Sequence, residues 1–176
     1  AFTGKTSTRD GTNLSVAQLS RRIRSSINYK LLEAGLVYPY FYMTLSAKLR
    51  DPMVKGMQKA YEKKRNLWGE DKSRKGLSLK DFSQLTEKQL IYPYLFRRII
   101  KNRYKRQMEG YWEAVAKKKK YQVDEDDLFL EQFYEDSDPY IFLIAERDFV
   151  KLSQIVQVSK AWIRMKTLPS NIVFLS

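Results

Sequence analysis

The side chains that could do chemistry in this chain are carboxylates, lysines and arginines, because its 176 residues include no histidine and no cysteine. Histidine is the usual general base near neutral pH, and cysteine supplies thiolate nucleophiles and soft metal ligands. Their absence excludes disulfides, Cys-coordinated zinc and iron–sulfur sites, and Ser-His or Cys-His triads. Carboxylate pairs, lysine bases and magnesium sites remain possible. The composition therefore disfavours an enzyme, and we expect no catalytic residue and no cofactor.

The densest group of carboxylates is the acidic run at residues 124–127, which could coordinate a hard cation. This run lacks the ligand spacing and the central glycine of an EF-hand loop. A charge run that faces solvent or a partner is the better explanation, so we predict no metal site.

The most informative stretch, residues 91–115, combines an apolar stripe with a dense cationic face. The apolar residues recur at steps of three and four, which is the period of an amphipathic helix. They are Leu95, Phe96, Ile99, Ile100, Tyr104, Met108, Tyr111, Trp112 and Val115, and the cations between them are Arg97, Arg98, Lys101, Arg103, Lys105 and Arg106. Because each side needs a partner, we predict a partner or lipid interface formed by Tyr92, Tyr94, Arg97, Arg98, Lys101, Arg103, Arg106 and Trp112.

A similar mixture of cations and aromatic rings occurs on nucleic-acid surfaces, where cations bind phosphates and rings stack on bases. Here the rings follow the apolar helical face, which favours a protein core or a protein interface over RNA. Anionic lipid headgroups are a further alternative for the cations, with Tyr and Trp suited to the membrane interface. Both the lipid and the RNA alternatives stay open.

The charge is strongly positive and unevenly distributed. The net charge is +13 and the pI is about 9.8, which implies an acidic partner such as nucleic acid, anionic lipid or an acidic protein surface. Residues 1–122 carry 28 Lys and Arg against 10 acids, whereas residues 123–148 carry one Arg and ten acids. The acidic block could fold back onto the basic body or meet a basic neighbour.

The elements that must position these residues are expected to be helices. The central helix begins near Pro93, or at Glu87 with a kink at the proline, and both alternatives leave Tyr94 to about Lys118 helical. We also predict a helix over residues 15–32, a helical segment restarting at Tyr38-Pro39, a helix capped by Asp51 with Pro52 in its first turn, and a final helix over residues 145–165. Residues 171–175 are expected to form a short extended tail.

These elements predict an all-α, elongated, multi-helix protein with irregular connecting segments. Seven glycines and five prolines are few, which suits long helices better than a sheet sandwich. We expect three segments: a basic Ser/Thr-rich arm (1–28), a helical domain (29–115), and an extension with the acidic segment and the final helix (116–176). No apolar run approaches the roughly 18–20 residues that span a bilayer.

The first 28 residues are rich in Ser, Thr and Arg and contain only Asp10 as an acid. This composition is similar to that of a mitochondrial targeting region, with a flexible basic arm as the alternative.

Residues 29–112 resemble subunit 7 of respiratory complex III, the small helical subunit on the matrix side of ubiquinol–cytochrome c reductase. The resemblance rests on the order of several short motifs. They are Tyr29-Lys-Leu-Leu-Glu-Ala-Gly-Leu36, the start at Asp51-Pro52 followed by Tyr61 and Arg65, Leu79-Lys-Asp-Phe82, and Leu90-Ile-Tyr-Pro-Tyr-Leu95. The family's Leu-Pro and Trp are replaced here by Leu-Lys and Phe82, and nothing after about residue 115 is covered.

The resemblance implies a non-catalytic accessory subunit at the matrix side of the mitochondrial inner membrane, packed against cytochrome b and the core subunits. Anionic lipid such as cardiolipin is a further expected partner of the basic helix. An RNA-binding mitoribosomal protein is the main alternative, followed by a peripheral subunit of another respiratory or ATP-synthase complex.

Overall fold

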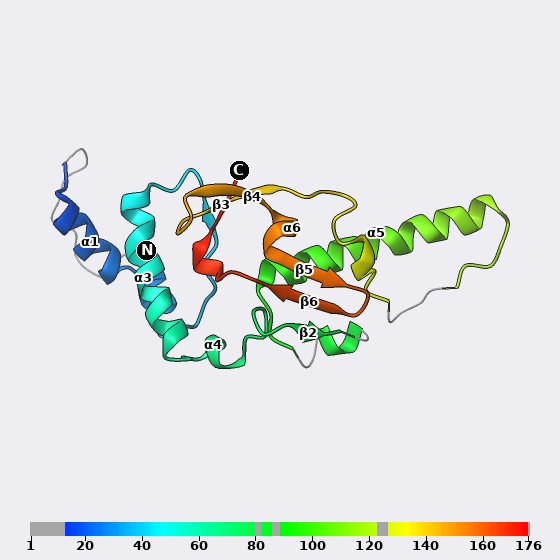
Figure 1. The fold of residues 1–176 in the computed structure, drawn as a ribbon, viewed down its shortest axis with the longest axis horizontal. Helices are drawn as coiled ribbons and strands as arrows, with labels where there is room; N and C mark the ends of the chain where they lie inside the picture. The colour runs from blue at the N-terminus through cyan, green and yellow to red at the C-terminus, as the bar shows by residue number, and fades with distance from the viewer. Residues whose placement is uncertain (1–12, 80–81, 86–88, 123–126, 176) are drawn as a thin grey trace. The chain divides into compact units, whose positions relative to one another are not determined.

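The computed structural model describes residues 13–79, 82–85, 89–122 and 127–175, and the chain divides into two compact units (Figure 1). Unit 1 comprises Ala1–Glu70, Ile141–Phe149 and Leu168–Ser176, and unit 2 comprises Asp71–Tyr140 and Val150–Thr167. Each unit therefore takes residues from both sides of position 116, where a segment boundary was predicted.

The helices of unit 1 are α1 (Val16–Ser25), α2 (Ile27–Ala34), α3 (Ala47–Glu62) and α4 (Leu67–Glu70). The helix predicted over residues 15–32 is present but is divided at Ser26, whose backbone is extended. The Ser26 hydroxyl donates to the carbonyl oxygen of Ile23 at 2.6 Å and accepts from the backbone N–H of Tyr29 at 3.2 Å, so it serves both helix ends. The apolar core beneath these helices is formed by Leu32, Met57, Ala60 and Trp68.

A four-stranded sheet, most of whose residues belong to unit 1, has the order β1 (Phe41–Tyr42), β7 (Ile172–Phe174), β3 (Tyr140–Leu143) and β4 (Asp148–Lys151). Strand β7 pairs in parallel with β1 and antiparallel with β3. All three consecutive residues of β7 are buried, so both faces of the sheet are covered at this strand. The 3-10 turn η3 (Pro169–Asn171) leads into this strand.

Unit 2 contains the long helix α5 (Pro93–Ala116) and an antiparallel sheet in the order β2 (Leu77–Ser78), β6 (Trp162–Met165) and β5 (Val156–Ser159). Ile163 and Met165 of β6 are buried and the intervening Arg164 is exposed, which is the alternation of a strand with one covered face. The short helices α6 (Leu152–Ile155) and η2 (Leu130–Gln132) belong to the same unit.

The prediction of an all-α fold is wrong, because the described residues form two sheets as well as helices. The final helix predicted over residues 145–165 is replaced by β4, α6, β5 and β6. The segment after Pro39 forms strand β1 rather than a helical turn. Helix α3 begins at Ala47, so Asp51 is not its cap and Pro52 lies inside the helix. The sequence also places Thr86 three residues before Gln89, which is the spacing of a helix-capping box, but this pair falls partly outside the described residues.

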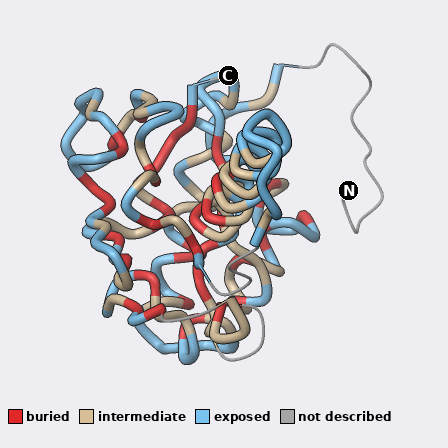
Figure 2. Tube along the Cα trace, turned by 90° about the vertical axis from the view of Figure 1, so that its right-hand side faces the viewer, coloured by how far each residue is buried: buried red, intermediate tan, exposed pale blue. Residues whose placement is uncertain are grey.

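The predicted start of helix α5 at Pro93 is confirmed, and the kinked alternative starting at Glu87 is wrong. The tail predicted over residues 171–175 is extended only at residues 172–174. These residues form the inner strand β7 of a sheet, and Asn171 belongs to the turn η3. Figure 2 views the molecule from the side on which α5 ends, and the near turns of this helix are exposed.

Candidate partner interface

Helix α5 starts where the sequence predicts because Pro93 fits the first helical position, where no intrahelical N–H bond is needed. Just before it, the backbone N–H of Tyr92 donates to the hydroxyl of Ser73 at 2.7 Å, and both residues are buried. Tyr92 was predicted to contact a partner, but only 1% of it is exposed. It therefore contributes to the core that anchors the helix.

One face of α5 carries the buried residues Leu95, Ile99 and Asn102, which follow one another at helical spacing. Asn102 is the polar member of this series and was missed in the sequence because it lies within a run of cations. Its side-chain amide donates to the carbonyl oxygen of Phe129 at 2.7 Å. Phe129 has a φ of 51°, a left-handed conformation that is uncommon for a residue with a side chain. Asn102 thus holds the turn that begins the segment 128–138.

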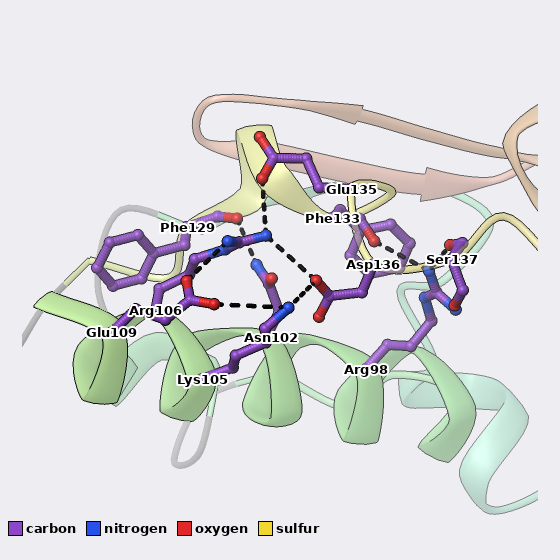
Figure 3. Close-up of polar contacts among 10 residues, drawn as sticks. All are labelled: Arg98, Asn102, Lys105, Arg106, Glu109, Phe129, Phe133, Glu135, Asp136 and Ser137. Atoms are coloured by element: carbon purple, nitrogen blue, oxygen red, sulfur yellow. Dashed lines mark hydrogen bonds and ion pairs between the residues drawn. The ribbon is translucent and has the colours of Figure 1, made fainter. Parts of the chain in front are cut away.

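Arg98 holds the other end of this segment (Figure 3). Its guanidinium donates to the carbonyl oxygen of Phe133 at 3.0 Å and to the hydroxyl of Ser137 at 3.2 Å. The same group lies 4.9 Å from the centre of the Phe133 ring, which is within the range of a cation–π contact. Arg98 was predicted to face a partner, and it binds the chain's own segment instead.

Between these two anchors, acidic side chains meet the cations of α5. Arg106 lies 2.8 Å from Glu109, 2.7 Å from Glu135 and 3.4 Å from Asp136, measured between guanidinium nitrogens and carboxylate oxygens. Lys105 also forms an ion pair with Asp136. The hydrogen bond from Lys105 lowers the pKa of Asp136 below its ordinary value, and the Arg106 charge acts in the same direction. Figure 3 shows the Arg106 guanidinium between the carboxylates of Glu135 and Asp136.

The sequence alone leaves two arrangements open for the acidic block, folding back onto the basic body or meeting a basic neighbour, and these contacts show the first of them. Glu135 and Asp136 fold back onto the basic helix of their own unit, so part of the cationic face is neutralised within the chain. The hydroxyl of Tyr134 donates to the carbonyl oxygen of Val156, which ties the same segment to β5, and burial raises the pKa of Tyr134. Residues 124–126 lie outside the described residues.

The remaining predicted interface residues are distributed around α5. Arg103 packs over the ring of Phe82, at 4.3 Å from its centre. Arg97 and Lys101 are exposed, Tyr94 is half-buried, and Trp112 is 61% exposed. The structure therefore does not gather the eight predicted residues on one surface.

A hollow of about 220 Å³ lies beside Arg98 and is lined by Tyr94, Lys101, Asn102, Phe133, Asp136 and Ser137. Small-molecule sites usually measure about 300–1,000 Å³. The hollow is smaller than that range, and its charges are largely engaged in the contacts that hold the segment 128–138. We therefore do not assign it to a cofactor.

The part of α5 beyond Asn102 has a different character, which the sequence did not reveal. Tyr104 is 67% exposed, and the apolar residues that follow it on the same stripe, Met108, Tyr111, Trp112 and Val115, are exposed as well. Figure 1 shows this half of α5 extending past β5 and β6 of the same unit. Of the apolar stripe predicted in the sequence, the first half packs inward and the second half does not.

Among the described residues, no group of three or more acidic side chains is arranged to hold a metal ion. No helix within the described ranges is both long enough and apolar enough to cross a lipid bilayer.

No known protein family, curated protein or solved structure matches this chain.

Proposed function

We propose that this protein is a non-catalytic accessory subunit that binds to other components of a larger assembly. The observation that carries the proposal is the exposed apolar half of α5, where five large apolar side chains lie on one stripe. Scattered exposed apolar residues are normal, but a contiguous group of them indicates an interaction site. The sequence without histidine or cysteine is compatible with a structural role.

The assembly that we propose is mitochondrial complex III, with the protein placed peripherally on the matrix side of the inner membrane. This part of the proposal is supported by the order of motifs in residues 29–112 and by the composition of residues 1–28. The expected neighbours are cytochrome b and the core subunits, and anionic lipid such as cardiolipin is expected near the basic surface.

The experiment that tests this proposal is affinity purification of the tagged protein from mitochondria solubilised in mild detergent. Co-purification of a complex with the haem absorbance of b- and c-type cytochromes would support it. A preparation that contains other respiratory or ATP-synthase subunits without cytochrome b would reject complex III and keep the accessory role. A preparation in which the protein is alone would reject the accessory role itself.

Binding to mitoribosomal RNA is the second candidate function, because the exposed rings of Tyr104 and Trp112 lie on the helix that leads into the four lysines at residues 117–120. Exposed rings and cations together can stack on bases and neutralise phosphates. Ribosomal RNA in the same purification, with binding that weakens steeply as salt rises, would favour this candidate.

A further inference from the structure

The exposed apolar residues of α5 have the spacing of a helix-pairing seam. Tyr104, Met108, Tyr111 and Val115 follow one another at steps of four, three and four, which is the alternation of a and d positions in a heptad. Trp112 lies beside this seam, and its ring contacts that of Tyr111 with the centres 5.2 Å apart. The seam spans three helical turns, or about 17 Å at 1.5 Å per residue.

The opposite side of α5 is already occupied by the rest of unit 2. Tyr104 comes two residues after the buried Asn102, and Met108 comes two residues after Arg106, so each is about 200° around the helix axis from it. Asn102 and Arg106 hold the segment 128–138. The seam is therefore a second face of the helix, directed away from the segment 128–138, and the ring of Tyr121 packs beside its Tyr111 with the ring centres 5.7 Å apart.

Charges mark both ends of the seam. Continuing the same spacing upstream gives Lys101 and Arg97, and continuing it downstream gives Lys118. Within the described part of the chain, the side chains of Lys118, Lys119 and Lys120 form no ion pair. The seam itself is locally neutral, because residues 104–116 contain two cations and two acids, and both acids are ion-paired.

These charges indicate which kind of molecule can bind to the seam. A second copy of α5 would bring the lysines at 118–120 against their own counterparts in a parallel pair, and against Arg97 and Lys101 in an antiparallel pair. Either arrangement places like charges together. A phosphate backbone could pair with the cations beyond the two ends of the seam, but it would lie against the neutral, apolar residues between them. A helix with an apolar stripe and acidic residues at its ends complements both the apolar seam and the cations at its ends.

We propose that the exposed face of α5 docks an amphipathic helix of another polypeptide, whose apolar stripe is bordered by Asp and Glu. The inference names the chemistry of the partner for the accessory role proposed above, and it rests on that role. The seam provides the apolar contact, and Lys101 with the lysines at 118–120 provides orientation and charge selection. The interface is short, so it contributes one contact among several that hold the protein in its assembly.

The test uses the full chain and two labelled 21-residue helical peptides that share an apolar a/d stripe. One peptide carries Glu at the flanking positions and the other carries Lys, and binding is followed by fluorescence anisotropy. We expect the acidic peptide to bind at least about tenfold more tightly than the basic one, because one peptide complements the cations and the other repels them. Equal binding of both peptides overturns the proposal.

Variants then locate the site. Tyr104→Ser combined with Val115→Ser should weaken binding of the acidic peptide by at least about tenfold, because two apolar anchors are lost. Val16→Ser is the matched control, since Val16 is 64% exposed on α1 in unit 1. Lys119→Glu with Lys120→Glu should weaken the acidic peptide and strengthen the basic one. Circular dichroism and thermal unfolding confirm that each variant is folded, and unchanged binding in a folded seam variant overturns the proposal.

Other occupants give distinct results that also overturn it. Concentration-dependent dimerisation that Tyr104→Ser with Val115→Ser abolishes would assign the seam to a second copy. Binding of a 20-nucleotide RNA that the same pair of substitutions abolishes would assign it to RNA. Comparison with the purification from mitochondria separates the two proposals. If the seam variant still enters the assembly and the peptides do not bind, the accessory role stands and the docking helix is rejected.

Discussion

A guanidinium nitrogen of Arg106 lies 2.7 Å from a carboxylate oxygen of Glu135, and this pair joins the most basic helix of the chain to its acidic segment. The two residues come from parts of the sequence with opposite charge. Only 18% of the Arg106 side chain is exposed, whereas the Glu135 side chain is 57% exposed. The contact explains how a chain with a net charge of +13 keeps two of its acids on the side of α5 opposite the exposed seam.

Replacing Arg106 with Gln should loosen the segment 128–138 from α5. Three carboxylates lose their common cation, and we expect the midpoint of thermal unfolding to fall by about 2–4 °C. Limited proteolysis with chymotrypsin should cut faster after Phe129 and Phe133. Lys119→Gln removes one positive charge from the same unit without breaking an ion pair, and it should leave both measurements unchanged. Equal effects of the two substitutions would mean that net charge, and not this contact, matters.

Asp136 should make the stability of the protein sensitive to acid. Its pKa in the folded protein lies below the ordinary value of 3.8, because Lys105 donates a hydrogen bond to it. The stabilisation is therefore present above about pH 4 and is lost as the pH falls through the folded pKa. Urea unfolding at pH 7 and pH 3 should show that Asp136→Asn lowers the midpoint at pH 7 and reduces the difference between the two conditions. Glu131→Gln, a change in an exposed acid of the same segment, serves as the control.

Asn102 should be the most important polar residue of α5 for stability. Substitution with Leu keeps a similar volume but removes the donor to the carbonyl oxygen of Phe129, in a position that is only 6% exposed. We expect a loss of about 1–3 kcal/mol in the free energy of unfolding. Tyr104→Leu changes an exposed residue two positions away and should alter it by less than about 0.5 kcal/mol. A loss for Asn102→Leu no larger than that would contradict the anchoring role.

Gly56 should not tolerate alanine, although alanine is the better helix former by about 1 kcal/mol. It lies inside α3, and a Cβ atom there would approach Cε2 of the buried Tyr29 ring to 2.9 Å. We expect Gly56→Ala to lower the melting temperature, because this ring has little room to move. Gly110→Ala is the comparison, since its Cβ would come 3.1 Å from Tyr121, a half-buried residue. Gly110→Ala should be clearly better tolerated, and the reverse order would show that the α2–α3 contact adapts.

The sequence predicts helices better than strands in this protein for a physical reason. Helix α5 is encoded locally, by Pro93 at its start and by apolar residues at a steady helical spacing. Strand β1 contains only Phe41 and Tyr42, and it pairs with residues 173 and 174 at the far end of the chain. No local period can reveal such a partner, because the pairing depends on how distant segments meet.

The prediction of a helix from Ala145 to Met165 is wrong for a different reason. Phe149, Leu152, Ile155 and Val156 do recur at helical spacing, but only Leu152–Ile155 makes a helical turn. The alternation of Ile163, Arg164 and Met165 and the β-branched residues Val156 and Val158 favour strands, and this signal was outweighed by the longer helical pattern.

For the candidate interface, spacing alone could identify an amphipathic helix but not which of its faces the rest of the unit covers. Leu95 and Ile99 are buried, whereas Tyr104 and Val115 lie on the opposite face of the helix and are exposed. The missing information is which face of α5 packs against the rest of unit 2. The cations Arg98 and Arg106 were likewise assigned to a partner, because the groups that they bind within the chain come about thirty or more residues later in the sequence.

The position of β7 has a consequence for synthesis of the protein. This strand follows the other three strands of its sheet in the sequence, yet it lies between β1 and β3. Until residues 172–174 leave the ribosome, β1 has no hydrogen-bonding neighbour in the sheet, because Phe41 pairs with Val173 of β7. The helices of unit 1 can form as they emerge, but its sheet closes only after β7 has emerged as well. Chaperones that protect nascent chains are thus expected to act on this unit until Phe174 has left the ribosome.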